Sequence, residues 1–165
     1  MSISFQQIHQ ISIDAAWYTQ PFKGFCLDSR KLEAGQIFIA LNSYSQPEKT
    51  RLFAENALNA GALAVISETD LGLANEWVCP EVRYLMGEWQ KQYLQVVDPV
   101  TALRGIAVTG TNGKTTISRL IAELISSQRQ GCAVMGTTGN GILPNLTPST
   151  HTTLDALQLQ NALHD

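Results

Sequence analysis

Short apolar runs separated by turn-forming residues characterise the first part of the chain. Residues 22–27 and 37–41 are two such runs, with an Asp-Ser-Arg turn between them. Apolar runs of this length, bounded by glycine and polar residues, are typical of strands. Apolar positions at helical spacing then cover residues 52–60 and end at Gly61, and residues 63–66 form a further apolar run. The pattern predicts a strand, a helix and a strand in succession.

The pattern changes near the middle of the chain. We expect a strand at residues 82–86 and a helix over residues 87–96 whose apolar positions share one face. The Asp98-Pro99 pair would end that helix, because a residue before proline avoids helical backbone angles. A domain boundary is therefore expected within residues 97–102. The two expected domains are residues 1–97 and residues 98–165.

The second expected domain shows the most regular spacing in the chain. An apolar run at residues 106–109 predicts a strand, and a helix with a core-facing apolar stripe follows it. The stripe consists of Ile117, Leu120, Ile121, Leu124 and Ile125. Residues 132–135 predict another strand, residues 136–141 form a glycine-rich loop, and a last helix begins near Leu154. Because a helix joins the two strands, they are expected to be parallel neighbours in an α/β sheet.

Composition and charge narrow the class of protein. The chain has 165 residues, of which 44% are hydrophobic and 15% charged, as in a soluble globular protein. Its formal charge of -3 provides no basic surface for nucleic acid, so we expect no nucleic-acid partner. No apolar stretch reaches the roughly 20 residues of a membrane span, and the N-terminus does not resemble a secretion signal. These features predict a cytoplasmic protein.

The cysteines and tryptophans indicate structural roles. Cys26, Cys79 and Cys132 are far apart and form no CxxC pair, so reduced, mostly buried thiols are expected rather than disulfides or a zinc site. Trp17, Trp77 and Trp89 are expected to pack in the core, because no basic surround accompanies them.

One segment carries explicit chemistry, the sequence GTNGKTT between the predicted strand and helix. It comprises Gly110, Thr111, Asn112, Gly113, Lys114, Thr115 and Thr116. The two glycines permit the backbone shape that turns N–H groups toward phosphate oxygens, and the helix N-terminus adds its partial positive charge. Lys114 would bridge the β- and γ-phosphates, and the Thr115 hydroxyl would coordinate Mg²⁺. This pattern predicts a site for ATP and Mg²⁺, with Lys114 in the catalytic role.

The plainer alternative is a glycine-rich turn that carries an exposed lysine. The preceding strand, the following helix and the Gly-Lys-Thr core all favour the phosphate-binding interpretation. One departure from the common form exists, since Val108 occupies the position of the usual first glycine and Gly110 lies only three residues before Gly113.

The segment and several others together resemble the Mur ligases of peptidoglycan synthesis. The matching segments are LDSR (27–30), GQIFIAL (35–41), GALAVIS (61–67), GTNGKTT (110–116), VMGTTGNG (134–141) and the pair Thr152-Thr153. Within the family, the chain is most similar to the ligase that adds the third residue of the stem peptide. The resemblance implies a small N-terminal α/β uridine-binding domain followed by the beginning of a P-loop Mur-ligase central domain.

The resemblance also implies roles for residues that are not distinctive by themselves. Contacts to the uridine end of the sugar nucleotide are implied for Leu27, Ser29, Tyr44, Ser45 and Gln46. Without the resemblance, Ser29 is a polar turn residue.

A second implied substrate segment lies near the end of the chain. Thr152 and Thr153 match the residues that contact the muramoyl peptide, and His151 is a further candidate contact. A structural alternative exists here too, because Thr152 followed by Asp155 fits a capping box before an apolar helix.

The resemblance implies an ATP-dependent ligase. It would phosphorylate the D-glutamate carboxylate of UDP-MurNAc-L-Ala-D-Glu, and the amine of an amino acid would attack the acyl phosphate. Only three carboxylates follow Gly113, and none ends an apolar strand, so we expect an N-terminal fragment without turnover of its own. No obligate protein partner is expected, and the added amino acid, meso-diaminopimelate or lysine, stays open. The alternatives are the ligase of the next step, which adds D-Ala-D-Ala, and a non-catalytic nucleotide-binding module.

Overall fold

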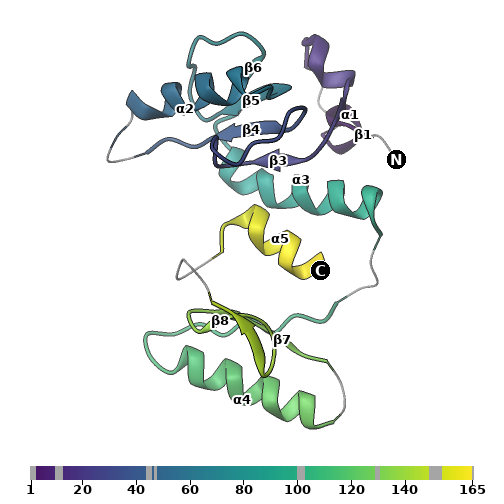
Figure 1. The fold of residues 1–165 in the computed structure, drawn as a ribbon, viewed down its shortest axis with the longest axis vertical. Helices are drawn as coiled ribbons and strands as arrows, with labels where there is room; N and C mark the ends of the chain where they lie inside the picture. Colours follow the sequence, from purple (N-terminus) through teal and green to yellow (C-terminus); the bar gives the residue numbers. More distant parts are fainter. Residues whose placement is uncertain are drawn as a thin grey trace. The chain divides into compact units, whose positions relative to one another are not determined.

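The computed structural model describes residues 3–9, 13–43, 46, 48–99, 103–128, 131–148 and 154–164 (Figure 1). The chain divides into two compact units: Met1–Val100 with His164–Asp165, and Thr101–Leu163. Five of the predicted contact residues lie outside the described residues, namely Tyr44, Ser45, His151, Thr152 and Thr153.

The first unit is built on a parallel sheet. Its elements are β1 (Ile3–Ser4), α1 (Phe5–Ile8), the 3-10 helix Ala16–Thr19, β2 (Pro21–Phe22), β3 (Phe25–Cys26), β4 (Ile37–Ala40), α2 (Glu48–Asn59), β5 (Ala64–Ser67), β6 (Glu76–Val78) and α3 (Val82–Val97). Strands β3, β4, β5 and β6 lie side by side in chain order, and all three pairings are parallel. The carboxyl ends of the four strands therefore share one edge of the sheet. The short strands β1 and β2 form a separate antiparallel pair.

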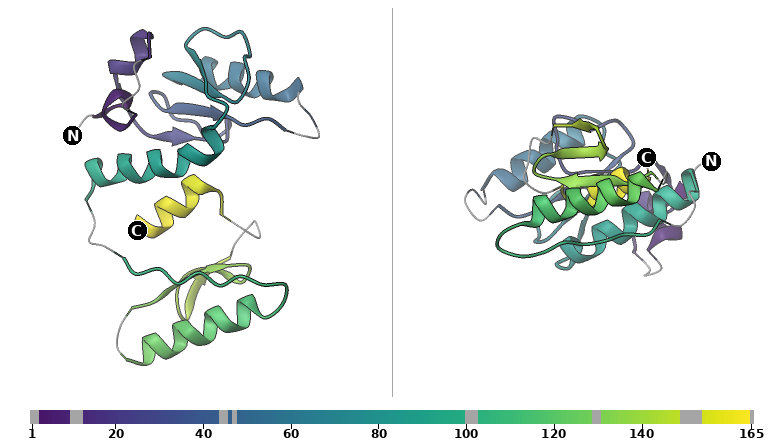
Figure 2. Two further views of the ribbon diagram at one scale, coloured as in Figure 1. Left: turned by 180° about the vertical axis from the view of Figure 1, so that it is seen from behind. Right: turned by 90° about the horizontal axis from the view of Figure 1, so that it is seen from below.

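Alternating residues of the sheet face two different layers. Phe38 and Ala40 of β4 pack with Val65 of β5 and with Ala54 and Ala57 of α2 in one buried cluster. Helix α2 covers this face and α3 lies on the opposite side of the sheet (Figures 1 and 2). Because all four residues of both β4 and β5 are buried, their sequences are nearly continuous apolar runs. The predicted strands at residues 37–41 and 63–66 and the predicted helix at 52–60 are confirmed. The apolar run 22–27 instead contributes to two short strands, β2 and β3, which belong to different sheets.

An aromatic cluster centred on Phe5 forms the other part of the core. The Phe5 ring has 0% exposure and lies 5.1 Å from the ring of Trp89, measured between centroids. Further rings within 6.3 Å of it belong to His9, Trp17, Tyr18, Phe22, Phe25 and Trp77. Large rings in edge-to-face contact bury much apolar area. The packing role predicted for the three tryptophans is confirmed.

The predicted strand at residues 82–86 is wrong, because these residues form the first turn of α3. In a strand, Val82, Tyr84 and Met86 would share a face, but Tyr84 is 88% exposed while the other two are buried. Burial instead follows the helical spacing of Val82, Met86 and Trp89. The strand of this region is β6, which the sequence pattern did not indicate.

The second unit differs more from expectation. Its elements are α4 (Lys114–Ser127), β7 (Ala133–Gly136), β8 (Gly139–Ile142), β9 (Asn145–Thr147) and α5 (Ala156–His164). Strands β7, β8 and β9 form an antiparallel sheet, so the predicted parallel pairing is wrong. Residues 103–109 form no strand, because they make no ladder with another described segment. The expected strand at 106–109 is therefore not present in the described residues.

The glycine-rich segment 136–141 is a tight hairpin rather than a loop. Only Thr137 and Thr138 form its turn, and Gly136 pairs with Gly139. A Cβ on Gly139 would lie 2.7 Å from the Thr147 carbonyl oxygen, and one on Gly141 would lie 2.8 Å from that of Asn145. These glycines let β9 approach β8 closely.

Helix α4 forms as predicted, but its apolar stripe is not buried. Ile117, Leu120 and Leu124 are 49%, 57% and 67% exposed, and Ala122 is the one buried residue of the helix. Apolar spacing thus predicted the helix correctly but not the burial of its stripe, because burial requires a neighbouring layer.

Helix α5 begins at Ala156, and Asp155 provides its cap. The Gln158 N–H donates to Asp155 Oδ1 at 2.8 Å. Asp155 is thus a capping residue of α5. Thr152, where the alternative capping box would begin, lies outside the described residues. None of the helices in the described part of the chain has the length and apolar character needed to cross a bilayer.

Candidate functional site

The segment 110–116 takes the shape that its glycines predict. Gly110 has a φ of 149° and Gly113 a φ of 79°, both in the region that favours glycine. A Cβ would have ordinary room at both positions, with its nearest neighbours at 3.6 and 3.7 Å. Backbone conformation, and not crowding, is therefore the reason for glycine here.

Helix α4 begins directly behind this loop. Gly113 is its N-cap, and the Ile117 N–H donates to the Gly113 carbonyl at 2.9 Å. Among the described residues, no side chain caps the first turn. The N–H groups of the first turn have no partner within a helix, and the helix dipole places partial positive charge at this end. The arrangement suits an anion with several oxygen atoms.

Lys114 folds back over the loop. Its Nζ donates to the carbonyl oxygens of Gly110 at 2.5 Å and of Thr111 at 3.4 Å. The side chain is exposed. The cation thus lies at the loop that its predicted role requires, and it is held there by backbone oxygens.

Thr115 contacts a residue that the sequence did not single out. Its Oγ1 lies 3.1 Å from Oγ1 of Thr137, in the β7–β8 turn. This hydrogen bond joins the first turn of α4 to the hairpin within the second unit. An open depression of about 380 Å³ lies beside them and is lined by Thr115, Thr116, Arg119, Leu120, Glu123 and Thr138.

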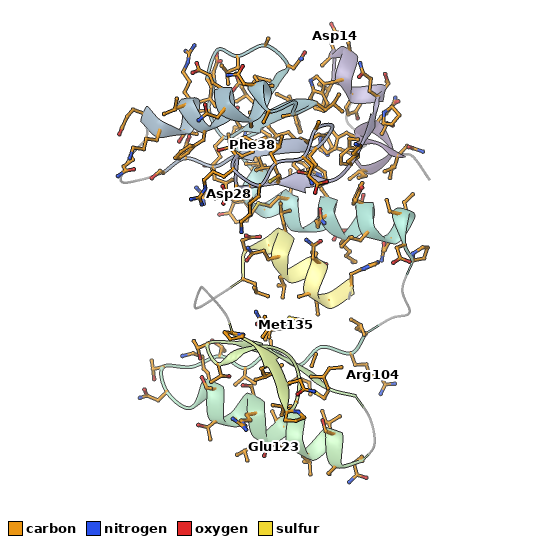
Figure 3. The ribbon with its side chains drawn as sticks, in the orientation of Figure 1. Asp14, Asp28, Phe38, Arg104, Glu123 and Met135 are labelled. Atoms are coloured by element: carbon orange, nitrogen blue, oxygen red, sulfur yellow. The ribbon has the colours of Figure 1, made fainter. Side chains whose placement is uncertain are left out.

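The donor set fits a phosphate group better than a free metal ion. Thr115 offers one hydroxyl, whereas the described residues contain no group of three His, Cys, Asp or Glu side chains that could hold a metal. Glu123, labelled on α4 in Figure 3, is paired with Arg119 at 3.0 Å. A Mg²⁺ ion at Thr115 would need phosphate oxygens for its other ligands.

The Asp-Ser-Arg turn follows β3 at the carboxyl edge of the parallel sheet (Figure 3). Asp28 receives two hydrogen bonds from the Arg30 guanidinium, at 2.9 and 2.8 Å, and one from the Arg30 N–H at 3.1 Å. These bonds lower the pKa of the Asp28 carboxyl from 3.8 to about 2. Asp28 therefore organises the turn, and the predicted contacts Leu27 and Ser29 are half-buried within it.

The segment after β4 reaches the same edge, because β3 and β4 are parallel neighbours. Gln46, a predicted contact, donates its N–H to Ser43 Oγ at 3.2 Å. Asn42 directly precedes Ser43 and is hydrogen-bonded to Glu68 and Arg83. The structure thus brings Leu27, Ser29 and Gln46 to one edge of the first unit's sheet.

Comparison with known proteins identifies the class to which the fold and the loop belong. Residues 108–165 match the family described as Mur ligase middle domain. A solved structure titled UDP-N-acetylmuramoyl-L-alanyl-D-glutamate--2,6-diaminopimelate ligase is 79% identical to this chain in the aligned region, which covers 99% of the chain, with a TM-score of 0.94. The chain belongs to the Mur ligase family, and its α/β fold is that of the family.

The individual relatives are more specific. The ligase of the same name from Haemophilus influenzae (strain 86-028NP) is 38% identical over 145 residues, which cover 83% of this chain. The one from Vibrio cholerae serotype O1 is 38% identical over 149 residues, which cover 84% of this chain. Both are MurE ligases, as the resemblance of the sequence implied.

The matches cover only part of each relative. The chain spans 29% of the length of these two curated relatives and 33% of the solved chain. The loop, the helix α4 and the hairpin fall within the matched middle-domain residues.

Proposed function

We propose that this chain supplies the sugar-nucleotide site and the phosphate loop of an ATP-dependent ligase. The ligase would join 2,6-diaminopimelate to UDP-MurNAc-L-Ala-D-Glu, in the cytoplasm and without an obligate protein partner. The loop carries this proposal: two glycines with positive φ lead into an uncapped helix N-terminus that begins with Lys114. The names of the relatives, all 2,6-diaminopimelate ligases, support the choice of the added amino acid over lysine.

The proposed reaction has two steps. A D-glutamate carboxylate oxygen attacks the γ-phosphorus of ATP, forming an acyl phosphate and releasing ADP. The amine of the amino acid then attacks the acyl carbon, loses a proton and expels inorganic phosphate. Bound Mg²⁺ would neutralise phosphate charge during the first step.

The residues of the loop act through position and charge. Lys114 would leave the Gly110 and Thr111 oxygens and contact the β- and γ-phosphates, while the first N–H groups of α4 bind phosphate oxygens. Thr115 would turn its hydroxyl to the metal, with Thr137 holding the rotamer. Charge stabilisation aimed at the transferred group is often the largest contribution to catalysis.

The first unit would bind the other substrate. Leu27 and Ser29 on the turn after β3, and Tyr44, Ser45 and Gln46 after β4, are the proposed uridine contacts. His151, Thr152 and Thr153 are the proposed contacts to the muramoyl peptide. The chain by itself would bind substrate without ligase turnover.

Titration calorimetry on the 165-residue chain tests the substrate assignment. UDP-MurNAc-L-Ala-D-Glu should bind, and Ser29→Ala should weaken that binding. Binding of ATP without any binding of the sugar nucleotide would contradict the proposal and favour a nucleotide-binding module. Preference for the tripeptide sugar nucleotide would instead indicate a MurF-type ligase.

Turnover of the complete ligase tests the loop. Lys114→Ala should abolish ATP consumption and leave affinity for the sugar nucleotide unchanged. Lys91→Ala is the matched control, because Lys91 is an exposed lysine on α3. Normal ATP consumption by the Lys114→Ala ligase would overturn the assignment.

A further inference from the structure

The ladder between β4 and β5 ends at the carboxyl edge of the sheet. Its last pair is Ala40 with Ser67. Two residues beyond Ala40, at Asn42, side chains replace the backbone as hydrogen-bond partners. The residues involved are Asn42, Glu68 and Arg83, which we call the Asn42 anchor.

Both backbone groups of Asn42 are bound by side chains. The Asn42 N–H donates to Glu68 Oε2 at 2.5 Å, and Arg83 Nη2 donates to the Asn42 carbonyl oxygen at 2.8 Å. Its side chain is bound as well, since Thr69 Oγ1 donates to Asn42 Oδ1 at 3.3 Å. The three partners come from the segment after β5 and from the first turn of α3.

The two charged residues also bind each other. Arg83 Nε donates to Glu68 Oε1 at 2.5 Å, and Arg83 Nη2 donates to Glu68 Oε2 at 3.1 Å. The Glu68 side chain is only 13% exposed, against 39% for Arg83. A two-pronged contact of this kind fixes both side chains in one geometry. It is therefore a rigid support for the Asn42 backbone.

The anchor continues directly into the proposed uridine contacts. Ser43 follows Asn42, and its Oγ accepts the Gln46 N–H at 3.2 Å. The Gln46 carbonyl in turn accepts the Lys49 N–H at 3.1 Å, at the beginning of α2. Hydrogen bonds and one peptide bond thus link Glu68 and Arg83 to Asn42, Asn42 to Ser43, and Ser43 to Gln46.

We propose that Glu68 and Arg83 are positioning residues for sugar-nucleotide binding. They hold the backbone of Asn42, so that the adjacent Ser43 and its hydrogen-bond partner Gln46 are in place before the uridine end arrives. Ordering a segment in advance strengthens binding, because the entropy of fixing it is not lost on association. This inference rests on the proposed function, and in particular on Gln46 as a uridine contact.

The test measures the dissociation constant of UDP-MurNAc-L-Ala-D-Glu for the 165-residue chain. Glu68→Ala and Arg83→Met should each raise it about tenfold. Glu68→Gln should weaken binding less than Glu68→Ala, because its amide oxygen still accepts the Asn42 N–H although its NH2 group cannot accept a hydrogen bond from Arg83. Arg51→Met is the matched control, since Arg51 forms an exposed ion pair with Glu55 at 2.8 Å on α2 and should leave affinity unchanged.

A charge-reversed double variant separates positioning from stability. Glu68→Arg combined with Arg83→Glu keeps an ion pair but places no carboxylate at position 68 for the Asn42 N–H. It should recover the melting temperature lost in the single variants without recovering the affinity. Recovery of both would show a structural role alone and overturn the proposal.

The outcomes distinguish this inference from the proposed function. If the unsubstituted chain binds no sugar nucleotide, the proposed function fails. If that chain binds and both Glu68→Ala and Arg83→Met bind equally well, the positioning role is wrong. Should those variants not fold by tryptophan fluorescence, Arg83→Lys decides, because it keeps the charge and loses the two-pronged contact; affinity equal to that of the unsubstituted chain then refutes the inference.

Discussion

Substitution of Gly113 by alanine isolates the cost of a backbone conformation. Gly113 caps α4 with a φ of 79°, and a Cβ there would meet only Ile117 Cδ1, at 3.7 Å. Left-handed backbone costs a residue with a Cβ about 1–2 kcal/mol, and no crowding adds to it here. In Gly113→Ala, the free energy required to open α4 should fall by that amount.

Two other glycines calibrate the result. Gly105 has open space around its Cβ position and no positive φ, so Gly105→Ala should change stability by less than about 0.5 kcal/mol. Gly139 has a φ of 124° and a Cβ position 2.7 Å from the Thr147 oxygen, so Gly139→Ala should cost more than Gly113→Ala. The expected order of destabilisation is Gly105, Gly113, Gly139.

The distribution of aromatic residues determines the assay. Every Trp, Tyr and Phe of the chain precedes residue 101, so fluorescence reports only on the first unit. Amide hydrogen exchange at α4, followed by mass spectrometry, reports on the second. Gly113→Ala should accelerate exchange there roughly 5- to 30-fold and leave the fluorescence transition unchanged. Exchange as slow as in Gly105→Ala would refute the conformational argument, and exchange as fast as in Gly139→Ala would refute the absence of crowding.

Three further predictions concern burial. Burial lowers the pKa of His9 below 6.5, so protonation of His9 favours the unfolded chain. The stability of the first unit, followed by tryptophan fluorescence, should therefore fall as the pH drops below 6.5. The fall should be smaller in His9→Phe, which cannot be protonated at this position. Phe5→Ala should lower the free energy of unfolding by about 3–5 kcal/mol in urea titrations, because the ring is wholly buried. Leu120→Ser should change the opening free energy of α4, measured by amide hydrogen exchange, by less than about 0.5 kcal/mol, since Leu120 is 57% exposed. A larger loss would mean that the apolar stripe of α4 is covered in solution.

Local pattern predicted the elements whose apolar residues are nearly continuous or recur at one spacing. β4 and β5 are buried on both faces and are nearly continuous apolar runs, and α4 repeats its apolar residues at helical spacing. The shape of the loop at residues 110–116 was predictable for a similar reason, because its two glycines and the start of α4 lie within seven consecutive residues. The start of α3 was missed because a short, mostly apolar segment such as residues 82–86 fits either a strand or a helix.

Long-range pairing was not predictable in this way. The hairpin β7–β8 depends on how Gly139 and Gly141 meet β9, which no local signal specifies. The contact between Thr115 and Thr137 spans 22 positions, and Arg83 reaches Asn42 across 41. Residues this far apart in the sequence form no local pattern, so their contact is visible only in the folded structure.

The contact of Lys114 with its own loop has a consequence for measured affinities. Its ammonium group already neutralises the carbonyl dipoles of Gly110 and Thr111, so a phosphate that binds as proposed must exchange one set of partners for another. A Lys114→Met chain would bind phosphate without that exchange. The affinity lost on removing the lysine would therefore understate the strength of the bond that the lysine forms with the nucleotide.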